Sequence, residues 1–204
     1  TVVLPGGDIV QLERPDEDST GYDLLGAYIG SEGCFGITLD VTVRLTPNPE
    51  GIRTMLADFT SVDDAAHAAS AIIAAGILPA ALELLDRATI VCVEDSIYAA
   101  GYPRDAAAVL LIEVDGALAG LDDDVSAVQR LCRESRAREV RTASDAAERA
   151  RLWQGRKKAF GAMGRMASHL AVQDAVVPRT KLAPILARIA EIGAKHRVRV
   201  CNVF

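Results

Sequence analysis

Residues 30–37 read Gly-Ser-Glu-Gly-Cys-Phe-Gly-Ile, and their composition points to chemistry more clearly than any other run in the chain. Three glycines surround a single carboxylate. Such a backbone can turn tightly and lie close to another group, because glycine has no Cβ to hold a neighbour away. An alternating strand expected over residues 37–46 would attach the loop to a rigid edge. The pattern predicts a cradle for a cofactor, and a tight turn between two strands is the alternative.

A second run, at residues 151–165, is basic and rich in glycine and lies at the end of a helix expected over residues 144–160. Within it, Arg156 offers a planar guanidinium group that can hold a carboxylate by two hydrogen bonds. In an acidic protein, such a local basic patch suits a small anionic ligand. The alternative for Arg156 is an ion pair with a neighbour on its own helix.

Residues 21–38, Gly-Tyr-Asp-Leu-Leu-Gly-Ala-Tyr-Ile-Gly-Ser-Glu-Gly-Cys-Phe-Gly-Ile-Thr, resemble the end of the flavin-binding domain, of the vanillyl-alcohol-oxidase type, in the FAD-linked oxidase family. That family includes 2-hydroxy-acid oxidases and dehydrogenases. Its usual motif has Thr and Leu where this chain has Cys34 and Phe35. Residues 151–165 and 173–182 resemble the C-terminal domain of the same family, in the branch of the glycolate oxidase flavin subunit. The resemblance covers nearly the whole chain.

The resemblance implies a flavoenzyme that passes a hydride from a small 2-hydroxy acid, of the glycolate or D-lactate type, to FAD. Arg156 matches the arginine that binds the substrate carboxylate. Phe160 and Val172 stand where a related branch for dicarboxylates has a threonine and a lysine, which favours a smaller substrate. The residues implied to contact FAD, mainly through the backbone, are Glu32, Gly33, Cys34, Phe35, Gly36 and Ile37.

No catalytic residue and no metal site are predicted within the chain. The three histidines have no partner at metal-ligand spacing, and the family's loop that carries the catalytic base and metal ligands is expected beyond Phe204. Both ends resemble cut ends. We therefore expect a fragment that by itself neither retains FAD tightly nor turns over substrate. The resemblance also implies an iron–sulfur partner subunit and, through it, peripheral association with the inner membrane.

The bulk composition excludes several classes of protein. A formal net charge of −6 argues against a surface for nucleic acid or anionic membranes. The four cysteines show neither zinc-ligand nor disulfide spacing, which fits a reducing compartment. No apolar run is long enough to span a bilayer. We expect a soluble, cytoplasmic protein whose core is built mainly from alanine and aliphatic side chains.

Two regions are expected, separated by a proline-containing stretch that follows residue 46. Residues 1–47 would be the C-terminal edge of a flavin-binding α+β domain and would begin with a hairpin. Residues 48–204 would be an α+β substrate domain, truncated at its C-terminal end. Its ferredoxin-like strand–helix–strand repeats would place helices on one face of a mostly antiparallel sheet. A doubly wound parallel fold is disfavoured because no glycine-rich turn joins a strand directly to a helix.

Hydrophobic periodicity and capping residues predict the individual elements of the second region. Strands are expected at residues 53–59, 78–85, 107–114, 139–142, 170–176 and 198–204. Helices are expected at residues 62–75, in a short segment up to residue 98, from residue 122 onward, and at 144–160 and 182–192. A ferredoxin-like ligand-binding or oligomerisation module without catalysis is the alternative function, because such modules also repeat strand–helix–strand units.

Overall fold

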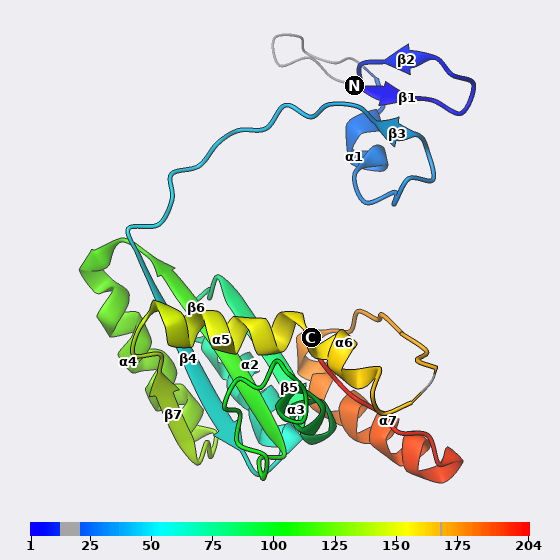
Figure 1. The fold of residues 1–204 in the computed structure, drawn as a ribbon. Helices are drawn as coiled ribbons and strands as arrows, with labels where there is room; N and C mark the ends of the chain where they lie inside the picture. Colours follow the sequence, from blue (N-terminus) through cyan, green and yellow to red (C-terminus); the bar gives the residue numbers. More distant parts are fainter. Residues whose placement is uncertain (13–20, 168) are drawn as a thin grey trace. The chain divides into compact units, whose positions relative to one another are not determined.

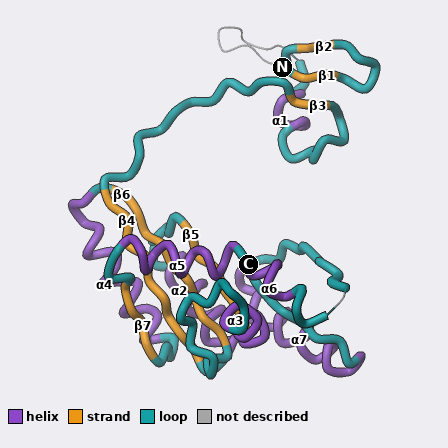
Figure 2. The backbone as a smooth tube through the Cα atoms, viewed as in Figure 1, coloured by secondary structure: helices purple, strands orange, loops and turns teal. Residues whose placement is uncertain are grey.

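The computed structural model describes residues 1–12, 21–167 and 169–204. The chain divides into two compact units, Thr1–Asn48 and Pro49–Phe204. The first contains short strands and long loops, whereas the second is built mostly of helices and strands (Figures 1 and 2). No helix among the described residues is long and apolar enough to cross a membrane.

The first unit is a small antiparallel sheet with one short helix. Its strands lie in the order β2-β1-β3. The hairpin predicted at the start of the chain is confirmed, because β1 pairs with β2 across a turn in which Leu4 and Asp8 are hydrogen-bonded. The elements are β1 (Val2–Val3), β2 (Ile9–Val10), α1 (Leu24–Tyr28) and β3 (Ile37–Thr38).

The long alternating strand predicted over residues 37–46 is wrong. Only Ile37–Thr38 forms a strand, and residues 39–49 have no regular secondary structure. A strand persists only where a neighbour supplies hydrogen bonds. Among the described residues, the neighbour of β3 is β1, and their pairing ends where the Leu39 N–H donates to the Thr1 carbonyl. The apolar side chains beyond this point are exposed.

The second unit contains a four-stranded, fully antiparallel sheet in the order β5-β6-β4-β7 (Figure 2). The predicted α+β class with an antiparallel sheet is confirmed. The strands are β4 (Gly51–Phe59), β5 (Ala81–Asp86), β6 (Ala108–Gly116) and β7 (Glu139–Thr142). The helices are α2 (Val62–Ala74), α3 (Arg87–Glu94), α4 (Leu118–Glu134), α5 (Ala146–Lys157), α6 (Ala159–Met163) and α7 (Leu182–His196), with a short 3-10 turn η1 (Arg179–Lys181) before α7.

Helices cover both faces of this sheet, so the prediction of helices on one face only is wrong. On β4, Met55 and Phe59 pack with α2 and α4, whereas Leu56 packs on the opposite face with α3, α5 and α6. Figure 1 shows α5 lying across that second face. The reason is visible in β6, where residues 108–112 are all apolar and buried because neither face of this strand meets water.

Local signals explain where the helices begin and end. Ser61 caps α2 by accepting hydrogen bonds from the N–H groups of Asp63 and Asp64. The helix ends just before Gly76, whose φ of +82° is readily adopted only by glycine. Both ends of α2 were predicted. The single helix predicted over residues 144–160 is instead two helices, because the backbone leaves helical geometry at Lys158.

The last part of the chain only partly follows the predicted repeat. No strand forms at residues 170–176 among the described residues, so that prediction is wrong, whereas the predicted helix is confirmed as α7. The predicted terminal strand is reduced to one antiparallel bridge between Val203 and Leu85. Asp86 fixes this bridge by accepting hydrogen bonds from the backbone and side-chain N–H groups of Asn202, at 2.7 and 2.9 Å.

Candidate functional site

The loop at residues 30–37 has a backbone that carries unpaired donors. Gly30, Glu32 and Gly33 have φ values of +81°, +50° and +82°, and consecutive residues of this kind turn N–H groups toward one side. Among the described residues, the N–H groups of Glu32, Gly33 and Phe35 donate to no protein acceptor. Backbone N–H groups of this kind can donate to an anionic or carbonyl group of a ligand.

Gly36 and Tyr28 hold the loop against the small sheet. A Cβ at Gly36 would lie 2.5 Å from the Val3 carbonyl oxygen, so no other residue fits this position without a shift. The Tyr28 hydroxyl donates to the Gly36 carbonyl at 3.2 Å and lies 3.0 Å from the Thr38 hydroxyl. The loop is therefore anchored at the glycine that leads into β3.

A pocket of about 1390 Å³ lies within the first unit. Of the residues predicted to contact the cofactor, Glu32, Gly33, Gly36 and Ile37 line this pocket, whereas Cys34 and Phe35 are not among its lining residues. Both of the latter are exposed. Helix α1 contributes Leu25 and Tyr28 to the wall. The loop thus borders a space large enough for part of a cofactor.

Arg156 lies on the second unit, near the end of α5. Its Nε donates to Oε2 of Glu83 on β5 at 2.7 Å. The alternative interpretation of Arg156, an ion pair with a neighbour on its own helix, is therefore wrong as to the partner, which lies on the sheet. Both side chains are about one-fifth exposed, at 20% and 23%. Among the described residues, the two Nη groups of Arg156 donate to no protein acceptor, so the outer edge of the guanidinium can take a carboxylate.

A second buried carboxylate, Glu113 on β6, was not singled out from the sequence. Its Oε2 accepts hydrogen bonds from Thr54 at 2.5 Å, Arg149 Nε at 2.8 Å and Trp153 Nε1 at 2.7 Å. Its Oε1 accepts from Arg149 Nη2 at 2.8 Å. The signal that would have found it is a single acidic residue at the end of the apolar run on β6, since a buried carboxylate needs partners.

The hydrogen bonds around Glu113 decide its protonation. Burial raises the pKa of this carboxyl, but the hydrogen bonds from Arg149, Thr54 and Trp153 outweigh burial and hold the pKa below its ordinary value. Glu113 therefore stays ionised at neutral pH. It is a fixed negative charge that anchors α5 to the sheet.

A surface depression of about 770 Å³ lies beside this cluster. It is positively charged, because the basic residues Arg149, Arg151, Lys157 and Lys158 all line it. Arg156 itself is not among its lining residues. Phe160 on α6 and Val172 in the irregular segment are both exposed.

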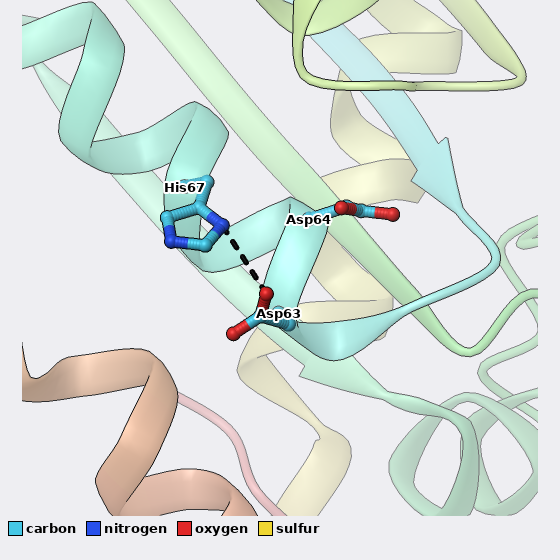
Figure 3. Close-up of side chains that lie close together, drawn as sticks. All are labelled: Asp63, Asp64 and His67. Atoms are coloured by element: carbon cyan, nitrogen blue, oxygen red, sulfur yellow. Dashed lines mark ion pairs between the residues drawn. The ribbon is translucent and has the colours of Figure 1, made fainter.

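The side chains of Asp63, Asp64 and His67 meet at the start of α2 (Figure 3). Their ligand-type atoms lie within 4.8 Å of one another, so the expectation that no histidine has a partner at metal-ligand spacing is wrong for His67. Both carboxylates already have protein partners. Asp63 pairs with His67 at 3.3 Å, and Asp64 pairs with Arg136 at 2.5 Å. The cluster is accounted for by its own ion pairs and by the N-terminus of a helix, where acids are favoured.

The second unit belongs to the class of α+β domains in which helices cover both faces of an antiparallel sheet. Two solved structures share the fold. Alkyldihydroxyacetonephosphate synthase matches with a TM-score of 0.72 and 15% identity, over 99% of this chain and 41% of the other. p-Cresol methylhydroxylase matches with a TM-score of 0.58 and 13% identity, over 79% of this chain and 38% of the other. At these identities the likeness concerns the fold alone.

Residues 48–204 match the family of FAD linked oxidases through its C-terminal domain, and the chain belongs to this family. The predicted resemblance is therefore confirmed. The glycolate oxidase subunit GlcD of Escherichia coli is 43% identical over 97% of this chain and 40% of its own length. GlcD of Bacillus subtilis is 39% identical over 98% of this chain and 43% of its own length. The mitochondrial D-lactate dehydrogenase [cytochrome] of Arabidopsis thaliana is 33% identical over 92% of this chain and 33% of its own length. The chain spans less than half the length of these relatives.

Proposed function

We propose that this chain is part of an FAD-dependent enzyme that oxidises a small 2-hydroxy acid of the glycolate or D-lactate type. The observation that carries the proposal is the 43% identity to a glycolate oxidase subunit over 97% of the chain, which includes both motifs. The relatives that match over nearly the whole chain bear the names of glycolate oxidase and D-lactate dehydrogenase. The half-open guanidinium of Arg156 adds a chemical reason, since every 2-hydroxy acid has a carboxylate.

In this proposal the two units have different tasks. Residues 1–47 form the C-terminal edge of the FAD-binding domain, and residues 48–204 form the substrate domain. Glu32, Gly33, Cys34, Phe35, Gly36 and Ile37 contact FAD, mainly through the backbone. The N–H groups of Glu32, Gly33 and Phe35, which donate to no acceptor among the described residues, fit such a close backbone contact. FAD supplies the acceptor for the hydride when it is bound.

The chain's own contribution to the reaction is to bind and orient. Arg156 holds the substrate carboxylate through its two Nη groups, which fixes the position of the neighbouring carbon that carries the hydroxyl. No residue of the chain is assigned as the proton acceptor. We further propose a cytoplasmic enzyme with an iron–sulfur partner subunit that associates peripherally with the inner membrane.

The test uses the longest natural polypeptide that contains this chain. It should bind flavin, detected by its absorbance, and reduce a dye with glycolate or D-lactate. Replacing Arg156 with Ala should raise KM about 100-fold, because a charge-assisted bidentate contact is lost. Arg156→Lys should recover only part of this loss, because lysine has no planar fork.

Arg130→Ala on α4 is the matched control, because Arg130 forms an exposed ion pair with Glu134 at 3.1 Å, away from the sites described above. It should leave KM and flavin content unchanged. A polypeptide that contains no flavin and does not oxidise either acid would contradict the proposal and favour a ligand-binding or oligomerisation module without catalysis. An unchanged KM in Arg156→Ala would remove Arg156 from the substrate site.

A further inference from the structure

Glu83 is a charged residue on a face of β5 whose other side chains, Ala81 and Leu85, are apolar. On β5 it lies between Ala81 and Leu85 on the face covered by α5, and it pairs in register with Leu111 on β6. A carboxylate on a largely covered face costs free energy unless it is paired. Its partner, Arg156, is 73 residues away along the chain. Such a costly and distant pair calls for a reason beyond helix stability.

Among the described residues, the ion pair leaves one oxygen of Glu83 and most N–H groups of Arg156 without a protein partner. Glu83 binds Arg156 through one oxygen and one nitrogen, Oε2 and Nε. A guanidinium has five N–H groups, and the other four lie on the two Nη atoms. Among the described residues these four have no protein acceptor. The contact at Nε restricts the side chain and leaves the Nη groups available as donors to a ligand.

We propose that Glu83 is a positioning residue, which fixes Arg156 so that its Nη edge faces the carboxylate of the 2-hydroxy-acid substrate. This inference rests on the proposed function, because it assumes that Arg156 binds substrate. A free arginine side chain loses up to about 2 kcal/mol of rotamer entropy when it is immobilised. The contact with Glu83 immobilises the Arg156 side chain when the protein folds, so this entropy is not lost again when substrate binds.

Two neighbours restrict the same arginine from the side of the helix. Gly155 precedes it, and a Cβ there would lie 2.7 Å from Ala100 Cβ and 2.9 Å from Tyr102 Oη. The Tyr102 hydroxyl in turn donates to the Leu152 carbonyl on α5 at 2.5 Å. Because α5 sits this close to its support, the backbone of Arg156 is fixed. Glu83 then fixes the side chain.

The experiment measures KM and kcat for D-lactate and glycolate in the full-length enzyme. Glu83→Ala should raise KM about tenfold while kcat changes by less than about threefold, because the arginine is present but no longer held. Glu83→Gln should stay within about threefold of the parent KM, because its amide oxygen still accepts from Nε. This rescue separates positioning from a general effect of the substitution.

A double-mutant cycle gives the second readout. In an Arg156→Ala background, Glu83→Ala should raise KM by less than about twofold, because there is no side chain left to position. Glu134→Ala, which removes an exposed carboxylate from its ion pair with Arg130, serves as the matched control and should change nothing.

The inference is overturned if Glu83→Ala leaves KM unchanged in a protein that melts at the parent temperature. It is also overturned if the effects of the two substitutions multiply. Failure of the proposed function has a different signature, because the parent polypeptide would then contain no flavin and would oxidise neither acid. An unchanged KM in Arg156→Ala, in an active enzyme, would overturn the assumption that Arg156 binds substrate. A Glu83→Ala protein that does not fold would be replaced by Glu83→Asp, whose shorter side chain should weaken the contact and raise KM in the same direction.

Discussion

Helix α5 carries two arginines that meet glutamates on the sheet, and the two pairs differ in how fully they are bonded. Both oxygens of Glu113 are occupied, by Arg149, Thr54 and Trp153. Glu83 uses one oxygen, for Arg156. The first arginine faces its carboxylate with two nitrogens and the second with one. A pair in which both carboxylate oxygens are bonded holds structural elements together. A pair with a single hydrogen bond can restrict the arginine and still leave its other N–H groups as donors for a ligand.

The contrast teaches how one helix can serve both stability and binding. Removing a buried carboxylate whose two oxygens are both bonded leaves several donors unsatisfied, which destabilises the fold. Removing the carboxylate from the pair with a single hydrogen bond mainly releases a side chain. Stability measurements and binding measurements should therefore separate the two glutamates.

The largest effect is expected at Glu113. Glu113→Ala should lower the free energy of unfolding by about 3 kcal/mol, because Arg149, Thr54 and Trp153 all lose their acceptor. Glu83→Ala should lower it by less than about 1 kcal/mol, as is usual for partly exposed pairs. Urea unfolding followed by the fluorescence of Trp153, the one tryptophan of the chain, measures both. If both variants lose the same free energy of unfolding, the proposed difference between the two glutamates is wrong.

Gly155→Ala should have the next largest effect and should act on both pairs together. The added methyl group would overlap Ala100 and Tyr102, which displaces α5 and costs about 2 kcal/mol of stability. Because both arginines move with the helix, KM for the hydroxy acid should rise as well. Gly161→Ala on α6 is the control, since a Cβ there meets nothing within 4 Å. A stable Gly155→Ala protein with normal KM would show that α5 has room to adjust.

The smallest effect is a dependence of stability on pH that belongs to Glu113. Because its pKa is lowered in the folded protein, the unfolded chain takes up a proton first as the pH falls below the ordinary value of 4.5. The stabilisation is therefore complete above that value and is lost as the pH falls through the lower, folded pKa. Urea midpoints at about pH 6 and about pH 4 should diverge less in Glu113→Gln than in the parent. Identical divergence would assign the acid sensitivity to other carboxylates.

Local signals predicted most of the second unit from the sequence. Ser61 with Gly76 defined α2, and β7 has the predicted bounds, Glu139–Thr142. The strands predicted at residues 37–46 and 170–176 failed for one reason. A strand depends on a hydrogen-bonding neighbour as well as on its own pattern, and alternation within a segment does not reveal the neighbour.

The candidate site was predicted in its parts and missed in its connections. The glycine loop and Arg156 stand out because each has unusual residues close together in the chain. Their counterparts, Glu83 and Glu113, lie tens of residues from the arginines they bind, and a lone glutamate in an apolar strand does not name its partner. Only the register of β5 against β6, in which Glu83 pairs with Leu111 and Glu113 with Ala81, places the two carboxylates as diagonal neighbours on the face covered by α5.

The bridge between β5 and the final residues has a consequence for biosynthesis. Leu84, Leu85 and Asp86 obtain their partners on one side from residues 202–204, more than a hundred positions later. A ribosome adds about 5–20 residues per second, so residues 202–204 are synthesised roughly ten seconds after this edge of the sheet. During that interval this edge of β5 lacks the backbone partners that residues 202–204 supply, and unpaired strand edges of this kind are prone to associate with other chains.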